Sequence, residues 1–288
     1  MLTRALVIAN RNSRQCSELR GPACAALRER GFELTIPELP HRERIRGIII
    51  ELAATHDLVI AIGGDGTINA TLPGVLETGL PLAILPAGTA NDLARTLGLP
   101  ADMPGAIEVI ARGNTRPIDV AEVNGVPFVN AASLGMSVDI TRQLDKPFKK
   151  RWGRLAYVLA ATRSLFHMRA FTATIESDGQ STKLRSVQTV VGNGRYFGTG
   201  MTVDASAEID DALLHLYAVK AVPWWRMLTL LPTLRAGTHE KSPAVVNITS
   251  DDLTIRTHRP KTISADGEIL TKTPARFIVR ARAIHVFA

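Results

Sequence analysis

Residues 57–69 read D-L-V-I-A-I-G-G-D-G-T-I-N, and this stretch decides the class of fold. Residues 58–62 form an unbroken apolar run, typical of a strand buried on both faces. Three glycines follow within four residues and allow the backbone to approach a ligand closely. A buried strand, a glycine turn with one carboxylate and a helix start are how α/β folds build phosphate sites. In isolation, a turn that binds nothing explains the same residues equally well.

The first 120 residues alternate between apolar runs and helical patterns. We predict strands at 4–9, 32–36, 58–62 and 82–85, with helices between them, the last of which covers residues 68–77. Strands and helices that alternate at this spacing predict right-handed βαβ units and a mostly parallel sheet covered on both faces. The expected fold class of this part is therefore α/β with a mostly parallel sheet.

From about residue 120 the sequence changes to short alternating segments separated by Gly, Asp and Asn turns. This pattern is typical of antiparallel strands and predicts a second, β-rich domain. We place the domains at 1–120 and 121–281, with the C-terminal segment of about 282–288 returning to the first domain. Helices are expected at 151–169 and 223–236.

A second glycine turn follows the strand predicted at 82–85, where residues 86–95 read P-A-G-T-A-N-D-L-A-R. It places Gly88, Thr89, Asn91 and Asp92 between the end of that strand and the start of a helix. Ligands of open α/β sheets bind at the carboxyl ends of neighbouring strands. Taken alone, Asn91 and Asp92 are more typical of helix capping. Together, the two turns favour a nucleotide site.

The 288-residue chain has a formal net charge of +7 and a pI near 9.8, so its surface favours anionic partners such as nucleotides or phospholipid head groups. No nucleic-acid partner is expected, because no motif of basic and aromatic residues supports one. Cys16 and Cys24 offer neither a disulfide framework nor zinc spacing. The sequence shows no signal-peptide pattern and no apolar run as long as a membrane span, which predicts a cytoplasmic protein.

Neither G-x-G-x-x-G nor G-x-x-x-x-G-K-[ST] occurs, which disfavours a dinucleotide Rossmann site and a Walker-type NTPase. Instead, residues 63–67 (G-G-D-G-T) and 86–92 (P-A-G-T-A-N-D) resemble the diacylglycerol kinase catalytic domain, which is related to sphingosine kinases and distantly to NAD kinases. The resemblance covers nearly the full chain through four further motifs near residues 128–135, 192–198, 207–213 and 266–268. It is closest to the bacterial soluble lipid kinases.

This resemblance implies an ATP- and Mg²⁺-dependent kinase that transfers the γ-phosphate to the hydroxyl of a diacylglycerol-like lipid at a membrane surface. It also implies that the second domain is β-sandwich-like and that the nucleotide lies between the domains. The alternatives are a sphingoid or NAD kinase of the same superfamily, or a catalytically silent protein that binds nucleotides or phospholipids. Peripheral membrane contact and a homodimer are compatible with this interpretation.

The resemblance assigns the ATP phosphates to the first glycine turn. In phosphoryl transfer the protein mainly positions the γ-phosphate and neutralises charge with Mg²⁺, and Asp65 is implied to hold this Mg²⁺ through water. Asn10 matches the family's N-terminal Asn-Pro-x-Ser-Gly element, whose Pro and Gly are Arg11 and Arg14 here. The implied nucleotide-binding set is Asn10, Gly63, Gly64, Asp65, Gly66, Thr67, Ile68, Asn69, Gly88, Thr89, Asn91 and Asp92.

The implied catalytic residues are Asp65 and two carboxylates near the C-terminus. The tripeptide at 266–268, D-G-E, is implied to take the proton from the lipid hydroxyl, and such a base contributes about 10²–10⁴-fold. Both Asp266 and Glu268 are candidates for this base. In isolation, the same tripeptide is typical of a β-turn.

A second, structural Mg²⁺ is implied at residues 207–213, A-E-I-D-D-A-L. Asp211 would supply a carboxylate, and Glu208 and Leu213 would supply carbonyl oxygens. The family's glycine is Ala212 here. If that position requires a positive φ, alanine strains the loop.

Two segments combine apolar and basic residues. Residues 146–154 place five positive charges beside Phe148 and Trp152, which suits an anionic membrane surface and equally a solvated helix start. The helix predicted at 223–236 begins with Trp224 and Trp225. Core packing is favoured for it over an interfacial position, since apolar helical faces usually bury within the protein. His215 and the other histidines show no ligand spacing and are interpreted as structural.

Overall fold

The structure is a computed structural model that describes residues 3–9, 14–38, 41–136, 138, 169–198 and 200–288. The chain forms two compact units. The first comprises Met1–Val120, Glu208–Ala212 and Arg280–Ala288, and the second comprises Ala121–Ala207 and Leu213–Val279. Compared with the boundaries predicted from sequence, residues 208–212 lie in the first unit, and the C-terminal return begins at Arg280. The predicted helix at 151–169 and the basic run at 146–154 fall almost entirely outside the described residues.

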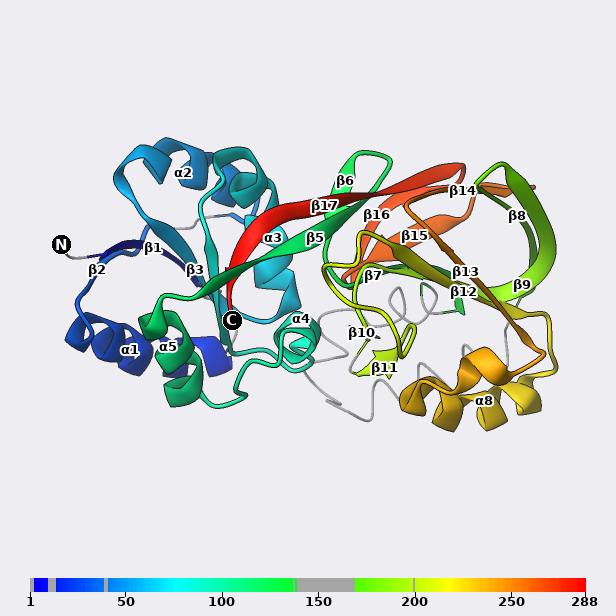
Figure 1. The fold of residues 1–288 in the computed structure, drawn as a ribbon, viewed down its shortest axis with the longest axis horizontal. Helices are drawn as coiled ribbons and strands as arrows, with labels where there is room; N and C mark the ends of the chain where they lie inside the picture. Colours follow the sequence, from blue (N-terminus) through cyan, green and yellow to red (C-terminus); the bar gives the residue numbers. More distant parts are fainter. Residues whose placement is uncertain (1–2, 10–13, 39–40, 137, 139–168, 199) are drawn as a thin grey trace. The chain divides into compact units, whose positions relative to one another are not determined.

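The first unit contains a parallel sheet with helices on both faces (Figure 1). The strand order is β2-β1-β3-β4, and the end of β17 (Ala275–Phe287) pairs in parallel with β4. Every residue of β3 and β4 is buried, which is the burial that continuous apolar runs predict. Besides the end of β17, the elements of this unit are β1 (Thr3–Ala9), α1 (Arg14–Glu29), β2 (Phe32–Thr35), α2 (Arg44–Leu52), η1 (Ala53–Thr55), β3 (Leu58–Gly63), α3 (Asp65–Thr78), β4 (Leu82–Pro86), α4 (Asp92–Thr96) and α5 (Met103–Arg112).

Helix α3 begins at Asp65, three residues before the start predicted from sequence. Gly64 is its N-cap residue, with an extended backbone, so part of the glycine turn is the first turn of the helix. The helix ends at Gly79, which has a φ of 70° and donates its N–H to the carbonyl of Val75. A left-handed residue at this position is the usual way to end a helix, and glycine adopts it at no steric cost.

The second unit is a β-sandwich-like domain of antiparallel strands (Figure 1). Its strands pair in the order β16-β15-β7-β9-β8-β14-β17, and β12 pairs with β9 and β13. Strand β5 begins in the first unit and pairs with β6 in the second. The elements are β5 (Thr115–Val123), β6 (Val126–Phe128), β7 (Ala131–Gly135), β8 (Phe171–Ser177), β9 (Gln180–Gly192), β10 (Tyr196–Phe197), β11 (Met201–Thr202), β12 (Leu214–Lys220), α8 (Trp224–Ala236), η2 (His239–Lys241), β13 (Val245–Ser250), β14 (Asp252–Thr257), β15 (Thr262–Ala265) and β16 (Glu268–Lys272).

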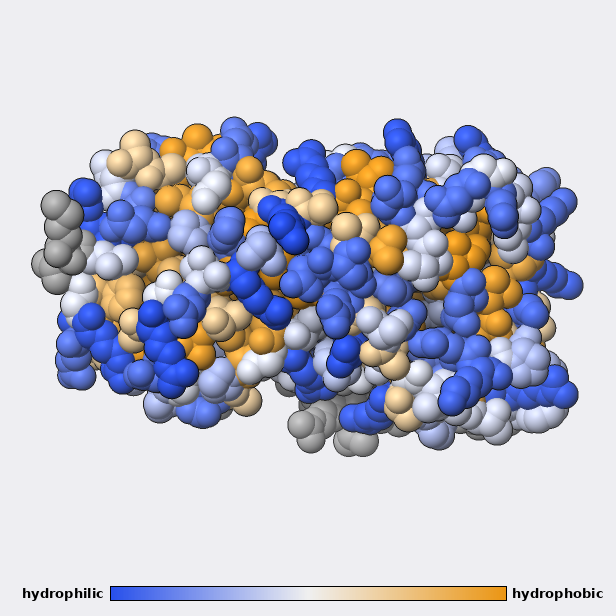
Figure 2. All heavy atoms as spheres, in the orientation of Figure 1, coloured by the Kyte–Doolittle hydropathy of each residue, from blue (hydrophilic) through white to orange (hydrophobic). Residues whose placement is uncertain are grey.

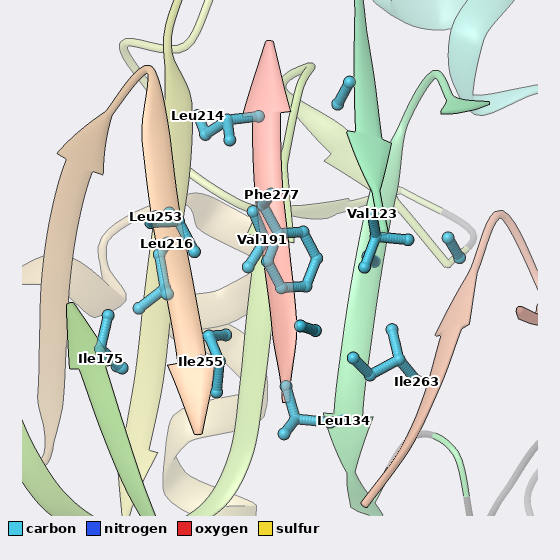
Figure 3. Packing of buried hydrophobic residues seen from close by; sticks show 14 of the residues in the cluster. Val123, Leu134, Ile175, Val191, Leu214, Leu216, Leu253, Ile255, Ile263 and Phe277 are labelled. Atoms are coloured by element: carbon cyan, nitrogen blue, oxygen red, sulfur yellow. The ribbon is translucent and has the colours of Figure 1, made fainter. Parts of the chain in front are cut away.

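The main core of the second unit consists of buried apolar side chains from β5–β9, β12, β14, β15 and β17, and Figure 3 shows ten of them labelled. Phe277 lies at its centre and meets Phe128 edge to face, with ring centroids 6.4 Å apart. A separate cluster holds the inner face of α8 through Met227, Leu230 and Leu234, which confirms core packing for that face. Within the described residues, no helix has the length and apolar character needed to cross a membrane.

Candidate active site

The two glycine turns of the first unit contact each other directly. A Cβ atom added to Gly64 would lie 2.9 Å from the Cα of Gly88, and one added to Gly88 would overlap the Cα of Gly64. The N–H of Ala87 donates to the carbonyl of Gly63, 3.0 Å away. The turns after β3 and β4 therefore pack backbone to backbone, as their positions at neighbouring strand ends predict. Glycine at 64 and 88 is explained by this close approach.

Asp65 joins the two turns through its carboxylate. One oxygen, Oδ2, accepts the N–H of Asp92 at 3.2 Å, and the other, Oδ1, accepts the N–H of Leu93 at 3.1 Å. Both donors lie in the first turn of α4, where backbone N–H groups have no intrahelical partner. The carboxylate thus caps α4 from the start of α3. A carboxylate oxygen can accept more than one hydrogen bond.

Several residues that the resemblance implies for nucleotide binding make contacts within the two turns. The Asn91 side chain accepts from the N–H of Gly88 and donates to its carbonyl, both at 3.0 Å, and its φ of 50° is left-handed. Thr67 is buried, and its side chain covers Gly63 so closely that a Cβ there would overlap the Thr67 hydroxyl. Asn69 is also buried. These positions make structural contacts that the sequence patterns did not specify.

The exposed part of the first turn is Gly66, with Thr89 exposed on the second turn. A Cβ added to Gly66 would meet nothing within 4 Å, and its φ is not positive. Neither packing nor backbone conformation therefore requires glycine here. Within the described chain, the N–H groups of Gly64 and Gly66 donate to no acceptor, whereas those of Thr67 and Ile68 donate to the carbonyl of Gly64. Asn10 lies outside the described residues.

Asp266 and Gly267 form the two-residue turn between β15 and β16 in the second unit. Their φ angles are 48° and 82°, and an Asp-Gly pair with two positive φ values is a favoured hairpin turn. The Asp266 carboxylate accepts three backbone N–H groups: those of Asn130 and Ala131 reach Oδ1 at 3.0 and 3.2 Å, and that of Val129 reaches Oδ2 at 2.9 Å. Asp266 therefore fixes the segment between β6 and β7 against the hairpin.

Glu268 is the first residue of β16 and is half-buried. It follows the turn directly, and its neighbour Ile269 is 53% exposed. Both oxygens of Asp266 bind the backbone, so Asp266 has a structural role in the hairpin that precedes Glu268. Every hydrogen bond from an N–H to a carboxylate stabilises the charged form and weakens the group as a proton acceptor.

Asp119, which the sequence patterns did not single out, organises the loop of the implied second metal. Asp119 is buried on β5, its Oδ2 accepts the N–H of Ala212 at 2.6 Å, and its Oδ1 accepts the N–H of Arg282 at 2.7 Å. Its own N–H donates to the carbonyl of Ile209. The signal in the sequence is an acidic residue within a strand whose neighbours, Ile118 and Val120, are apolar and buried.

The loop itself is closed by Asp211, whose Oδ2 accepts the N–H of Glu208 at 3.0 Å. Within the described residues, no cluster of three or more His, Cys, Asp or Glu side chains is arranged to hold a metal ion. The loop carries the Asp211 carboxylate that the resemblance implies, together with the carboxylates of Glu208 and Asp210 and the carbonyl groups of Glu208 and Leu213. This matches the implied ligand set in kind, and metal binding there remains a prediction.

Ala212 has a φ of 60°, so the position that carries glycine in the resembled family does require a left-handed backbone here. We expect Ala212→Gly to raise the free energy of unfolding by about 1 kcal/mol, because glycine adopts this conformation without the steric penalty of a Cβ. Ala111→Gly is the matched control on the exposed side of α5 and should lower it by a similar amount. Urea denaturation of the three proteins measures both changes. Equal effects of the two substitutions would contradict the strain at Ala212.

His215 binds the carboxylate of Asp204 in the second unit. Its Nδ1 lies 3.0 Å from Oδ2 of Asp204, and both side chains are largely buried. Burial would raise the pKa of Asp204, but hydrogen bonds from the Ser206 hydroxyl and N–H and from His215 together hold that pKa below its ordinary value. The pair fixes the segment after β11, in agreement with a structural role for His215.

Comparison with protein families agrees with this geometry in both units. Residues 4–123 match the model described as the diacylglycerol kinase catalytic domain. Residues 130–288, more than half of the chain, match the model described as the YegS C-terminal NAD kinase beta sandwich-like domain. The chain belongs to the diacylglycerol kinase catalytic-domain family, with a YegS-like C-terminal domain. The family and the fold class predicted from the sequence are confirmed.

Individual members of the family show the same similarity. A protein named diacylglycerol kinase from Staphylococcus epidermidis is 29% identical over 238 residues, 82% of this chain and 75% of that protein. The Synechocystis protein sll0036, which has no assigned activity, is 28% identical over 236 residues, 80% of this chain and only 54% of that protein. A crystal structure assigned as a diacylglycerol kinase from Bacillus anthracis has a TM-score of 0.82 at 25% identity, covering 99% of this chain and 96% of that one.

Proposed function

We propose that this member of the diacylglycerol kinase family transfers the γ-phosphate of ATP to the hydroxyl of a diacylglycerol-like lipid. The observation that carries the proposal is the contact between the two glycine turns around Asp65. In this arrangement Gly66 is exposed at the start of α3, and no protein atom lies within 4 Å of a Cβ added there. Free N–H groups at a helix N-terminus attract phosphate through their hydrogen bonds and the helix dipole. Transfer of labelled phosphate from ATP to a lipid tests the proposal.

Asp65 fits the magnesium that such a kinase uses. Mg²⁺ keeps several of its waters and takes few carboxylates, and the Asp65 carboxylate lies where the two glycine turns meet, bound to the N–H groups of Asp92 and Leu93. Bound there, Mg²⁺ would neutralise charge on the β- and γ-phosphates. Asp65 would orient the ion's waters, while Gly64 and Gly66 would bind phosphate oxygens through their N–H groups.

The second unit would supply the base for the acceptor hydroxyl. We assign this role to Glu268, because the Asp266 oxygens already accept three backbone N–H groups. Asp266 would then hold the hairpin that positions Glu268. The proposal assigns phosphate binding to the first unit and proton transfer to the second.

Gly66 is the residue of the first glycine turn whose substitution should affect ATP binding most. We expect Gly66→Ala to weaken ATP binding at least about tenfold, because the added methyl occupies the space where a phosphate approaches the backbone. The same change should leave the free energy of unfolding equal or up to about 1 kcal/mol higher, since nothing in the protein meets the methyl. Isothermal titration calorimetry and urea denaturation measure the two quantities.

Gly47→Ala is the matched control, since Gly47 lies in α2 and a Cβ there also meets nothing within 4 Å. It should gain helix stability and bind ATP as the wild type does. If Gly66→Ala binds ATP with unchanged affinity, the phosphates do not approach this turn and the assignment of the site is wrong.

The proposed acceptor lies in a membrane, so the protein would act at the cytoplasmic surface as a peripheral enzyme without nucleic-acid partners. A sphingoid or NAD kinase remains the main alternative within the family, because the turns of the first unit bind phosphate whatever the acceptor is. The alternative that involves no catalysis is a silent protein that binds nucleotides or phospholipids. An acceptor panel separates these alternatives.

A further inference from the structure

The chain enters β7 between the ends of two other strands. β7 pairs with β15 on one side and with β9 on the other. Asp266 is the first residue after β15, and Asn193 is the first residue after β9. Both residues bind the three residues where β7 begins, 129–131, which we call the entry segment.

Asp266 binds the entry segment through the N–H groups of that segment. The Asp266 carboxylate accepts all three of them, over distances of 2.9 to 3.2 Å. The N–H of Asp266 in turn donates to the carbonyl of Ala131 at 3.1 Å. Because Glu268 follows the Asp266–Gly267 turn directly, the position of the entry segment contributes to where the first residue of β16 lies.

Asn193 binds the same segment through the carbonyl groups of that segment. The Nδ2 of Asn193 donates to the carbonyl of Val129 at 3.0 Å. The N–H groups of Asn193 and Gly194 donate to the carbonyl of Asn130 at 2.9 and 3.3 Å. All six backbone N–H and carbonyl groups of the entry segment are therefore bound, and the ends of β15 and β9 fix the segment from both sides.

The Asn193 side chain is buried, which is costly for an amide. Hydrophilic side chains cover much of the face shown in Figure 2, whereas Asn193 is only 1% exposed and its strand neighbour Val191 is fully buried. An apolar side chain of the same size would avoid the cost of burying an amide. It would also leave the Val129 carbonyl without the Nδ2 donor, which costs free energy in turn. The amide is therefore explained by the carbonyl that it binds.

We infer that Asn193 is a positioning residue for phosphate transfer, because it holds the entry segment against the hairpin that carries Glu268. The inference rests on the proposed function, which assigns the role of the base to Glu268. A base must lie within hydrogen-bond reach of the hydroxyl that it deprotonates. A displacement of about 1 Å can lower the rate by about 10²-fold. A loosened entry segment should therefore slow proton transfer without weakening ATP binding.

The test compares Asn193→Leu with Ser186→Ala in the lipid kinase assay. Leu has nearly the shape of Asn but no donor, so we expect kcat to fall at least about tenfold while the KM for ATP stays within about twofold. Ser186 is the matched control, since it is also buried on β9 and its hydroxyl donates to the carbonyl of Val219 at 2.9 Å. Ser186→Ala should lower the melting temperature and keep the turnover of each folded molecule. Equal effects of the two variants on kcat would overturn the inference.

Asn193→Asp gives a readout that a loss of packing would not change. A charged carboxylate has no hydrogen to donate to the Val129 carbonyl, whereas the protonated form carries an O–H donor. Burial and the Asp266 carboxylate on the other side of the entry segment both favour the protonated form. The kcat of this variant, relative to the wild type at the same pH, should therefore rise as the pH is lowered, and that of Asn193→Leu should stay constant. A relative kcat of Asn193→Asp that stays low at every pH would overturn the role of the donor.

Amide hydrogen exchange, followed by mass spectrometry, separates this inference from the proposed function because it requires no lipid. In Asn193→Leu the amides of the entry segment should exchange at least about tenfold faster than in the wild type, and in Ser186→Ala they should exchange at the wild-type rate. If the wild type phosphorylates no lipid, the proposed function fails, and the exchange rates still decide whether Asn193 holds the entry segment. If the wild type phosphorylates a lipid and Asn193→Leu changes neither kcat nor exchange, the inference fails and the proposed function stands.

Discussion

Asp65→Asn is expected to lower phosphoryl transfer from ATP by at least about 10²-fold, because it removes the negative charge to which the proposed function assigns Mg²⁺. The structure also predicts that this variant is less stable than the wild type. Asp65 accepts the N–H groups of Asp92 and Leu93 through separate oxygens, and an amide offers only one acceptor oxygen. One N–H of α4 then loses its partner, which should lower the free energy of unfolding by about 1–3 kcal/mol. Steady-state kinetics and urea denaturation measure the two effects.

Asp102→Asn is the matched control for a carboxylate that caps a helix of the same unit. Asp102 is the N-cap of α5, and its Oδ1 accepts the N–H of Gly105 at 2.8 Å. Asn caps helices nearly as well as Asp, so stability and turnover should both stay close to the wild type. If Asp65→Asn is destabilised but turns over ATP normally, Asp65 only clamps the two turns and the magnesium assignment is wrong.

Glu268→Gln is expected to lower kcat by about 10²–10⁴-fold, the contribution of a general base, with a smaller effect on the KM for ATP. The reason lies in the neighbouring turn. Both oxygens of Asp266 accept backbone N–H groups and hold the hairpin, so the proposal gives Asp266 the positioning role and Glu268 the role of the base. Because Gln has nearly the same shape as Glu, the variant should keep the wild-type melting temperature.

Asp266→Asn should affect stability more than turnover, which is the opposite of Glu268→Gln and so distinguishes the roles of the two carboxylates. The new amide NH₂ would face backbone donors of the segment at 129–131, so hydrogen bonds to a charged group are lost, at about 1.5–3 kcal/mol each. We expect a lower melting temperature as the main effect, with turnover per folded molecule reduced less than in Glu268→Gln. An Asp266→Asn protein of wild-type stability and no turnover would move the base to Asp266.

The sequence predicts the first unit well because its signals are local. The apolar runs of β3 and β4 can only be buried on both faces, and glycine turns at their ends can only meet when the strands are neighbours. The close approach of Gly64 and Gly88 follows from that arrangement. The start of α3 was predicted too late, because glycines read as a loop also serve as the N-cap and first turn of a helix.

The parts that the sequence could not predict depend on distant contacts. The hydrogen bonds of Asp119 join residues 93 and 163 positions away, and those of Asp266 join residues more than 130 positions away. No local pattern specifies which backbone N–H a buried carboxylate will meet. The roles of Thr67 and Asn91 inside the turns likewise require the folded backbone, since their residue types suit a ligand contact equally well.

The measurement that tests the account most directly is phosphate transfer from γ-labelled ATP with Mg²⁺ to a panel of acceptors. The panel should hold diacylglycerol and sphingosine in detergent micelles and NAD in solution, with Asp65→Asn as the inactive control. The account predicts a labelled lipid phosphate from diacylglycerol that is absent with Asp65→Asn. Label in NAD alone, or no labelled product from a protein that binds ATP, would contradict it.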